Sequence, residues 1–499
     1  MEKIEKFSAI ELIKNNYKYV LSILATIIMA VILYTNAVDL PKKFLVLLFL
    51  IASSLIIFLP RKIEYATIAI ILVMGGLSAL ISPINDIPDE YVHQARAVYI
   101  AEGDFNLTNN IKKLKVSEDV KRISEHTGQT LVNETLKETK HNSKEFSYSA
   151  IKMTNAYYSI SYLPQAFGIC LGNFLNLPVI VTYYLGRICN LLVYALLIFL
   201  ALKISGSLKQ VIAVVSLIPM NIYLAASYSQ DGFALGIVLL TLSIFMNMIQ
   251  KKTDSIPNGH LLLYYLLCAI LVLTKFTYFL LVLLPFFIPN EKFGKNRKLI
   301  LLNKILGIII VTAFAAIWFK LYGQVKTPQL ADFLKQVNAG KQIHNIISQP
   351  LLYGRVVLRE MLVNLFNLDN IFTFGALSYG ISNLFTLYAV FAVIVYLNNA
   401  TKVIINWWTR LGILLVIAGI TGATVLALYL TWTPVGELSV LGVQSRYLIG
   451  ILPLVFLVFT NQNKQMEKVK DFLSTKAVLN IALLFNICMI LSTIFKYYN

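Results

Sequence analysis

Long apolar runs separated by short polar segments make up most of the chain. Many of these runs approach or exceed the ~20 residues that an α-helix needs to cross a bilayer. They lie at 18–35, 42–60, 64–82, 179–204, 210–226, 232–250, 261–289, 303–321, 373–397, 410–431, 446–461 and 477–496. The run 261–289 suits a pair of short helices, because "TKFTY" interrupts its middle. The pattern predicts an all-α, polytopic transmembrane protein with about thirteen spans.

Two segments between 83 and 178 depart from this pattern. Residues 83–152 are polar, and loops of that length are usually functional or disordered. Residues 155–178 are rich in aromatic side chains and contain Pro164. Because tyrosine favours the boundary between lipid and water, we expect this second segment to form a helix that lies in the membrane interface.

Basic residues are concentrated in the short loops. The chain has 43 Lys and Arg against 25 Asp and Glu, a net charge of +18, and "QKKTD" and "EKFGKNRK" are strongly basic. A basic chain can bind nucleic acid, but in a chain that is 58% hydrophobic the basic loops indicate the cytoplasmic side instead. This rule places the N-terminus inside the cell. It places 83–178, "SYSQDG" (227–232), Lys275 and 322–372 outside.

The predicted topology divides the chain into five segments. They are three N-terminal transmembrane helices (1–82), an outer loop with interfacial helices and an acidic motif (83–178), a transmembrane core (179–321), a second outer segment (322–372) and C-terminal transmembrane helices (373–499). The four Cys lie in apolar runs, and no two of the five His have the spacing of metal ligands. No nucleotide-binding loop is present in the sequence.

Three carboxylates follow the third apolar run closely, in "NDIPDEYVHQAR". The proline before the Asp-Glu pair suits the first turn of a helix that Asn85 or Asp86 would cap. Helical spacing then puts Asp86, Glu90 and His93 on one face, with Asp89 beside them. Acids in a first turn also offset the helix dipole, so a purely structural role is one interpretation. The other is catalytic, because clustered carboxylates raise one another's pKa and so suit a general base.

Three cations lie in or beside apolar runs. Charged side chains at Arg187, Lys275 and Arg446 are costly in hydrocarbon unless they reach water or meet an anion. Each by itself can be an interfacial anchor. Together they predict a phosphate-binding site in the outer leaflet. Asp231, at the start of a span, is expected to cap its helix.

The motif "PDEYVHQARA" (88–97) resembles the Pro-Asp-Glu-x-x-His-x-x-Arg-Ala motif of a bacterial multispanning membrane family of unknown function. Further motifs of that family have counterparts here. They are "YLPQAFG" (162–168), Arg187 with Asn190, Ser227 with Asp231, Lys275, "LYLTWTPVG" (428–436) and "GVQSRY" (442–447). One departure is the outer turn, which has Ser-Gln-Asp (229–231) in place of the usual Asn-Pro-Asp. The resemblance covers about 83–455, and the first two spans look like additions to the family's pattern.

The order of these motifs is in turn similar to that of the GT-C glycosyltransferases, including the protein mannosyltransferase group. Those enzymes share an Asp-Glu pair at the start of the first outer loop, an interfacial aromatic helix and a Leu-Thr-Lys hairpin, here 273–275. The resemblance implies a polyprenyl-phosphate sugar donor and a glycan or lipid-linked acceptor. It also implies an active site that faces outward from a bacterial plasma membrane, and inversion at the sugar's anomeric carbon.

The candidate site residues follow from these motifs. As catalytic residues we expect Asp89, Glu90 and Asp86. As substrate-binding residues we expect His93, Arg96, Tyr162, Gln165, Arg187, Asp231, Lys275, Gln444 and Arg446. The resemblance implies donor-phosphate contacts for the three cations named above. A divalent cofactor stays open, because carboxylates are suitable ligands for Mg²⁺ or Mn²⁺.

Three other functions fit the same sequence. A polymerase of lipid-linked glycan repeats would share the outer loop and the arginines, but it would make long chains from one substrate. A transporter or flippase would hold its substrate near the midplane between inverted repeats, and no internal repeat is evident. A non-catalytic assembly partner is the third, and a close homologue without Asp89 and Glu90 would favour it.

Overall fold

Membrane-length helices dominate the computed structural model, which is 75% helical. The structure describes residues 9–34, 40–110, 113–142, 146–148, 157–322, 332–366, 369–381, 383–399, 403–460 and 473–498. Within these ranges, seven helices are long and apolar enough to cross a membrane. They are α1 (Ala9–Tyr34), α3 (Ile63–Ile81), α7 (Val179–Ile204), α10 (Asp231–Gln250), α12 (Arg297–Tyr322), α16 (Trp407–Thr431) and α18 (Thr475–Tyr497). The chain is therefore an all-α, multi-pass membrane protein, as predicted.

Several of the predicted spans form shorter or broken helices. Residues 210–226 are divided between α8 (Lys209–Ser216) and α9 (Pro219–Ala225), with a bend of 74° between them. Pro219 explains the break, because it has no backbone N–H to continue the first helix. The other short elements are η3 (Gly206–Leu208), α2 (Lys42–Ile57), α11 (Asn258–Thr274), η4 (Phe276–Phe287), η8 (Ser445–Ile451) and α17 (Leu452–Val458). The count of about thirteen spans stays a prediction.

The apolar run 373–397 is not one continuous helix, which corrects the prediction for this segment. After the turn η7 (Asp369–Phe372), the strands β3 (Thr373–Phe374) and β4 (Tyr379–Gly380) form an antiparallel hairpin, and α15 begins only at Leu384 and ends at Asn399. Gly375, Ala376 and Leu377 all have positive φ at the hairpin turn. A right-handed helix cannot pass through such residues.

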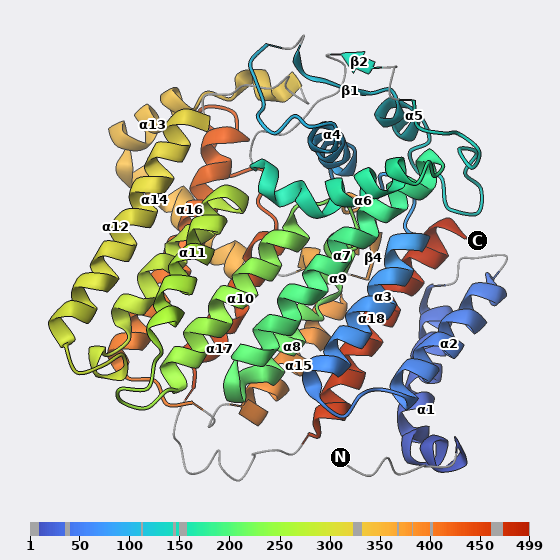
Figure 1. The fold of residues 1–499 in the computed structure, drawn as a ribbon, viewed down its shortest axis with the longest axis horizontal. Helices are drawn as coiled ribbons and strands as arrows, with labels where there is room; N and C mark the ends of the chain where they lie inside the picture. The colour runs from blue at the N-terminus through green and yellow to red at the C-terminus, as the bar shows by residue number, and fades with distance from the viewer. Residues whose placement is uncertain are drawn as a thin grey trace.

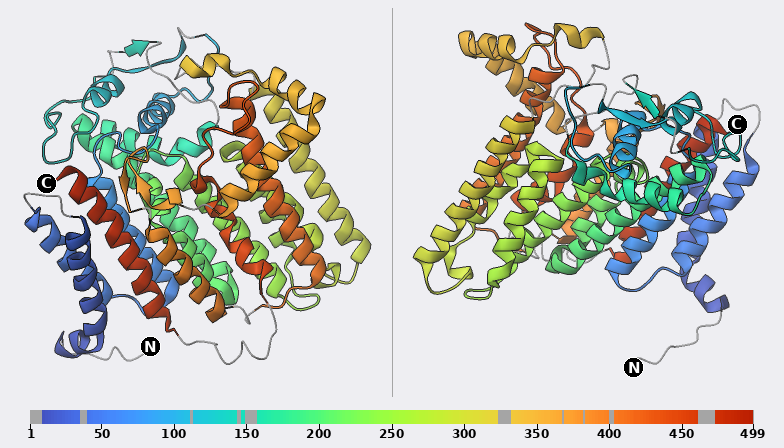
Figure 2. Two further views of the ribbon diagram at one scale, coloured as in Figure 1. Left: turned by 180° about the vertical axis from the view of Figure 1, so that it is seen from behind. Right: turned by 45° about the horizontal axis from the view of Figure 1, so that its top comes forward.

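The long polar segment folds over one end of the helical bundle, which we call the α4 end (Figure 1). Its elements are α4 (Glu90–Ala101), β1 (Lys115–Ser117), α5 (Asp119–Glu125), β2 (Phe146–Tyr148), η2 (Ser159–Tyr162) and α6 (Leu163–Phe174), with β1 and β2 paired antiparallel. From the second outer segment, η6 (Asp332–Gln336), α13 (Ala339–Ser348) and α14 (Pro350–Phe366) follow, and α13 also lies at this end (Figures 1 and 2). Helix α1 begins at the other end of the bundle (Figure 1), where η5 (Asn290–Lys292) also lies.

Helix α6 lies across the ends of α7 and α10 (Figure 1), the arrangement expected of a helix in the membrane interface. Two glycines allow this close packing. A Cβ at Gly168 would lie 2.6 Å from the carbonyl oxygen of Leu185, and one at Gly186 would lie 2.2 Å from the hydroxyl of Tyr228. Small residues at helix contacts let backbones approach closely. Here they bring α6 and the turn before α10 against α7.

Single cysteines test which end of the bundle faces outward. Lys121 on α5 and Lys295 after η5 are both exposed and lie at opposite ends of the bundle. In a Cys170→Ala background, which removes an exposed native thiol, Lys121→Cys should react with an impermeant maleimide in intact cells. Lys295→Cys should react only after the cells are broken. The opposite labelling pattern would show that the predicted topology is inverted.

Candidate functional site

A buried ion pair joins the acidic motif to the bundle. Both Glu90 and Arg187 have fully buried side chains. The Nε and Nη2 atoms of Arg187 donate to Oε1 and Oε2 of Glu90 at 2.9 and 2.7 Å. Oε1 of Glu90 also accepts the backbone N–H of Tyr228 at 3.1 Å. This two-pronged contact is the geometry in which an arginine binds a carboxylate most strongly.

The remaining donors of Arg187 are also used. Nη1 donates to the carbonyls of Ala79 and Ser82 at 3.0 and 2.8 Å, and Nη2 donates to the carbonyl of Pro83 at 2.7 Å. Nη2 also donates to the Tyr183 hydroxyl at 2.9 Å. All three guanidinium nitrogens therefore have protein acceptors, and no free N–H faces a ligand. This corrects the expectation that Arg187 contacts a donor phosphate.

Asp86 is held by three tyrosines from distant parts of the chain. The hydroxyls of Tyr223 and Tyr379 each donate to Oδ2 at 2.7 Å, and that of Tyr497 donates to Oδ1 at 2.6 Å. Burial raises the pKa of the Asp86 carboxyl, and the three phenols oppose this effect because they bind its ionised form. Asp86 is 8% exposed, so it anchors its loop and is not placed to act as a base on a substrate.

Asp89 is the acid of the motif that remains exposed. It is the N-cap of α4 and has a left-handed backbone, with φ of 59°. The helix therefore begins at Glu90, several residues later than the predicted caps at Asn85 and Asp86. Because Asp86 precedes the helix, it does not share a helical face with Glu90 and His93. The two buried carboxylates at 86 and 90 lie on either side of Asp89 and fix its position.

Two cations from distant segments meet beside this acid. The Nζ atom of Lys275, at the end of α11, donates to Oδ1 of Asp231 at 2.6 Å. The same Nζ lies 5.2 Å from the ring centroid of Tyr447, and the guanidinium carbon of Arg446 lies 5.4 Å from that centroid. Asp89 and Asp231 both act electrostatically on Arg446. The predicted meeting of Lys275 and Arg446 is therefore present, and Asp231 is the partner of Lys275.

His93 forms one wall of the same cluster. Its Nδ1 atom is 2.9 Å from the hydroxyl of Tyr162 on η2, and its ring is 6.2 Å from that of Tyr157. Burial lowers the pKa of the His93 imidazole, although the charges of Asp89 and Asp231 favour protonation. The ring is consequently neutral at pH 7. Of the predicted residues, Asp89, His93, Tyr162, Asp231, Lys275 and Arg446 thus form one cluster.

The other predicted residues have different surroundings. Gln165 is fully buried, and its Nε2 is 3.3 Å from the carbonyl of Tyr228, so it supports the turn before α10. Arg96 is fully buried, and its Nη2 donates to the carbonyl of Phe105 and to the Ser159 hydroxyl at 2.8 and 2.9 Å. The roles of Gln165 and Arg96 in substrate binding stay predictions.

Comparison with known families finds a match over most of the chain. The model of a family described as predicted membrane proteins (DUF2142) matches residues 72–455. The chain belongs to this family. No curated protein and no solved structure matches it. The DUF2142 region contains the acidic motif, the interfacial helix and the three cations, and it leaves α1 and α2 outside, as the motif resemblance predicted.

The structure of this DUF2142 protein also identifies residues that sequence reasoning missed. Tyr157 and Tyr447 line the cluster; Tyr157 lies in the aromatic-rich segment 155–178, and Tyr447 is the last residue of "GVQSRY". Asn190 holds the turn before α10 through the carbonyls of Ser227 and Ser229, at 2.9 and 3.0 Å. The three tyrosines that bind Asp86 carried no local signal, because they are scattered over the chain.

The carboxylates of the acidic motif do not converge as metal ligands. Glu90 is occupied by Arg187 and Asp86 by three phenols, so neither turns toward Asp89. Among the described residues, no group of three or more His, Cys, Asp or Glu side chains could hold a metal ion. The residues present thus do not fit the Mg²⁺ or Mn²⁺ site that the sequence left open.

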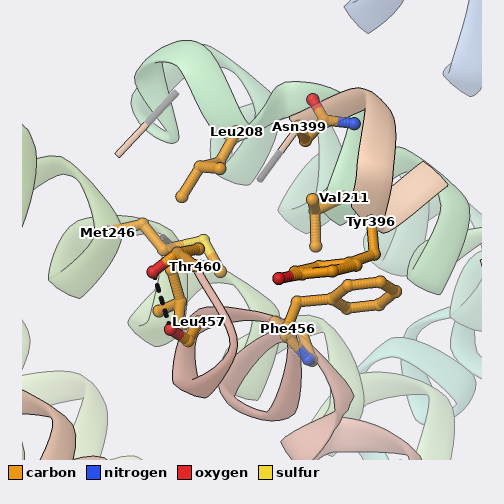
Figure 3. A pocket seen from close by; sticks show the side chains of 9 residues that line it. Leu208, Val211, Met246, Tyr396, Asn399, Phe456, Leu457 and Thr460 are labelled. Atoms are coloured by element: carbon orange, nitrogen blue, oxygen red, sulfur yellow. Dashed lines mark hydrogen bonds between the residues drawn. The ribbon is translucent and has the colours of Figure 1, made fainter. Parts of the chain in front are cut away.

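A small cavity at the other end of the bundle contains none of the candidate residues (Figure 3). It lies among α8, α15 and α17 and has a volume of about 10 Å³, room for roughly one water. Its polar side chains have protein partners: Thr460 donates to the carbonyl of Leu457 at 2.8 Å, and Asn399 donates to that of Val395 at 2.7 Å. This cavity is part of the packing and not a second site.

The neighbouring acids at 89 and 90 should behave differently in a stability test. Glu90→Gln leaves the buried guanidinium of Arg187 without a countercharge, and breaking a buried ion pair typically costs ~3–5 kcal/mol. Asp89→Asn alters an exposed side chain with no capping hydrogen bond. We expect a clear fall in apparent Tm in detergent for Glu90→Gln and a value near that of the unaltered chain for Asp89→Asn. Equal Tm values for the two variants would contradict the anchoring role of Glu90.

Proposed function

We propose that this chain is a membrane glycosyltransferase that moves a sugar from a polyprenyl-phosphate donor to a cell-envelope glycan or lipid-linked acceptor. The observation that carries the proposal is that the exposed Asp89 carboxylate acts electrostatically on Arg446, which lies against the same Tyr447 ring as Lys275. Such a reaction needs a base for the acceptor hydroxyl and cations for the leaving phosphate. The cluster contains both.

In the proposed reaction, Asp89 accepts the proton of the acceptor hydroxyl while the oxygen attacks the anomeric carbon of the sugar. The bond from that carbon to the donor phosphate breaks on the opposite face, so the configuration inverts. The polyprenyl phosphate leaves with one further negative charge. Arg446 is suited to stabilise this charge, because a guanidinium binds two phosphate oxygens at once. Lys275, held by Asp231, adds a second positive charge beside it.

Asp86 and Glu90 act in this scheme as positioning residues. Their carboxylates are buried and fully engaged on either side of Asp89, which leaves the middle acid exposed and constrained. A base that is held in place before substrate binds need not be ordered during the reaction. Neutral His93, fixed by Tyr162, can hydrogen-bond to a sugar hydroxyl without adding charge.

An apolar cavity next to the cluster supports a lipid-borne donor. It has a volume of about 570 Å³, lies among α8, α15, α16 and α17, and is lined almost wholly by apolar side chains. Leu448 and Ile451 of η8 form part of its wall, and Arg446 is on the same element. A hydrocarbon chain in this cavity would place its phosphate near Arg446. A lipid donor also suits an outward-facing site in a bacterial plasma membrane, because nucleotide sugars are cytoplasmic.

Two alternative functions make different predictions about the product and the place where the substrate binds. A polymerase of lipid-linked repeats would use the same base and cations, and the length of the product distinguishes it from a transferase that adds one sugar. A transporter or flippase would bind its substrate near the midplane. Asp89 and His93 of the cluster belong to α4, which lies at one end of the bundle (Figure 1), and this favours group transfer over transport.

Loss of the exposed carboxylate should remove activity without unfolding the protein. We expect Asp89→Asn to lower the rate of sugar transfer by roughly 10²–10⁴-fold, the usual contribution of a general base. The assay is release of polyprenyl phosphate from a labelled polyprenyl-phosphate sugar by purified protein in vesicles. Asp104→Asn, which alters an acid beyond the end of α4, is the control and should keep full activity. Unaltered turnover by Asp89→Asn would rule out this base.

Removal of Arg446 should weaken donor binding more than its replacement by lysine. Hydrogen bonds to charged groups contribute ~1.5–3 kcal/mol, so Arg446→Ala should bind a polyprenyl-phosphate analogue roughly 10–100-fold more weakly. Arg446→Lys should lie between, because it keeps the charge but not the two-pronged contact. Arg355→Ala, at an exposed position on α14, is the matched control.

Lys275 needs a paired variant in the same binding assay. Lys275→Met alone would leave Asp231 without its partner, so Lys275→Met is combined with Asp231→Asn. We expect this double variant to fold and to bind the analogue more weakly. Binding equal to that of the unaltered chain in both this variant and Arg446→Ala would show that these cations are interfacial anchors only.

A further inference from the structure

Helix α13 has an exposed apolar side. Ile343 and Ile347 lie four residues apart, on one side of the helix, and are 43% and 72% exposed. Lys341, His344 and Ser348 are also exposed and share another side, which is polar. This separation of apolar and polar side chains is typical of a helix that lies along a membrane surface, with one side in lipid and the other in water.

The apolar side of α13 continues onto α14, which begins after a single intervening residue. Leu351, in the first turn of α14, is 89% exposed, and Leu358 and Leu362 are exposed on the same side. Arg355 and Arg359 share this side, and long cationic side chains in lipid extend to the head groups. The other side of α14 packs along the span α16. The leucines therefore face the lipid beside that span.

Tryptophan side chains indicate the depth of α13 in the bilayer. The span α16 begins with Trp407 and Trp408 and is followed directly by Trp432. Its 25 residues are roughly 38 Å long, enough to cross ~30 Å of hydrocarbon. Because tryptophan favours both boundaries between lipid and water, Trp432 marks the boundary at one end. Helix α13 packs against α16 at the edge of the bundle (Figure 1) and contacts the segment just after Trp432, so it lies at that boundary.

The same contacts join α13 to the loop that carries Arg446. The side chain of Gln342, on α13, is buried, and its Oε1 accepts the backbone N–H of Gly436 at 2.9 Å. The carbonyl of Gln336, just before α13, accepts the backbone N–H of Val435 at 3.2 Å. The loop then runs to η8, in which Arg446 is the second residue. The position of α13 therefore bears on the position of Arg446.

We propose that α13 lies on the lipid surface at the α4 end and positions the loop of Arg446 at the depth of a lipid phosphate. The second half of this inference rests on the proposed function, whereas the lipid contact does not. Ile343 and Ile347 enter the lipid beside the leucines of α14, which sets the height of α13. The bond from Gly436 to Gln342 carries that height to the loop. Arg446 then meets the phosphate of a lipid-borne donor, because the same membrane surface fixes the depth of both.

A lipid surface fits α13 better than a second copy of the chain. A ten-residue helix is roughly 15 Å long and 10 Å wide, so one side of it offers far less than the ~800 Å² that each partner buries in a stable protein interface. The apolar side is instead continuous with the side of α14 that faces lipid. Lys341, on the polar side, suits the phosphates of lipid head groups.

Quenching by a labelled lipid tests the contact with the membrane. In the Cys170→Ala background, Ile347→Cys is labelled with the fluorophore NBD and placed in phosphatidylcholine vesicles whose lipid carries a nitroxide close to the head group. Ser348→Cys is the matched control, because it is the next residue, is also exposed and lies on the polar side. We expect quenching at least twofold stronger at Ile347→Cys than at Ser348→Cys.

Two outcomes would overturn the lipid contact. One is equal quenching at the two positions, or no quenching at Ile347→Cys. The other is shielding of Ile347→Cys from the nitroxide that disappears when the protein is diluted in lipid, because this would identify a second copy of the chain as the occupant.

The link to Arg446 is tested by removing the acceptor on α13. Gln342→Ala should bind a polyprenyl-phosphate analogue about fivefold more weakly, the usual effect of one lost hydrogen bond, while the quenching at Ile347→Cys stays the same. Gln349→Ala, at an exposed glutamine just after α13, is the matched control and should bind normally. In an Arg446→Ala background, Gln342→Ala should have no further effect, because the side chain that it positions is gone.

These binding results separate the inference from the proposed function. Normal binding by Gln342→Ala together with weak binding by Arg446→Ala would overturn the positioning role of α13 and leave the donor site standing. A full fivefold loss from Gln342→Ala in the Arg446→Ala background would also overturn that role, since the loss would not act through Arg446. Normal binding by Arg446→Ala itself would count against the proposed donor site.

Discussion

The buried contact between Glu90 and Arg187 is the constraint on which the rest of the site depends. Two charges have been removed from water, which is favourable only when every donor and acceptor is satisfied. The structure meets this condition with the carbonyls at the end of α3, the hydroxyl of Tyr183 and the backbone of Tyr228. The pair therefore ties α3, α4, α7 and the turn before α10 into one unit. Asp89 and His93 of the charged cluster belong to α4, and Asp231 directly follows that turn.

This buried ion pair helps to determine which of the three acids is exposed. Asp86 is bound by tyrosines from α9, β4 and α18, and Glu90 is bound by Arg187. Between these anchors the chain turns through a left-handed residue, which an aspartate tolerates better than most side chains. Asp89 is left facing the cations. Its position is determined by the buried neighbours, so the substrate need not order it.

The two cations of the cluster, Lys275 and Arg446, differ in their interaction partners. Lys275 is paired with Asp231, whereas Arg446 lies against the Tyr447 ring, and its Nε has no hydrogen-bond partner among the described residues. Arg446 therefore keeps one buried donor that no described residue uses. An apolar cavity lies beside η8, the element that carries Arg446.

The sequence by itself determined the membrane helices, the interfacial segment and the gathering of unusual polar residues at one end. These follow from hydrophobic length, aromatic content and loop charge, which are local properties. It also predicted that Lys275, Asp231 and Arg446 would lie at the same end, because each falls at the corresponding end of its apolar run.

Only the tertiary structure decided which of the three acids faces outward, and which partner each charge would have. Asp86, Asp89 and Glu90 are alike in sequence, and the start of α4 is displaced from the predicted caps by contacts with Arg187 and with tyrosines 223, 379 and 497. The hairpin that brings Tyr379 to Asp86 lies in an apolar run that suggests a single span. Local pattern cannot predict such contacts, because the free energy of a buried charge depends on donors that are far away in the chain.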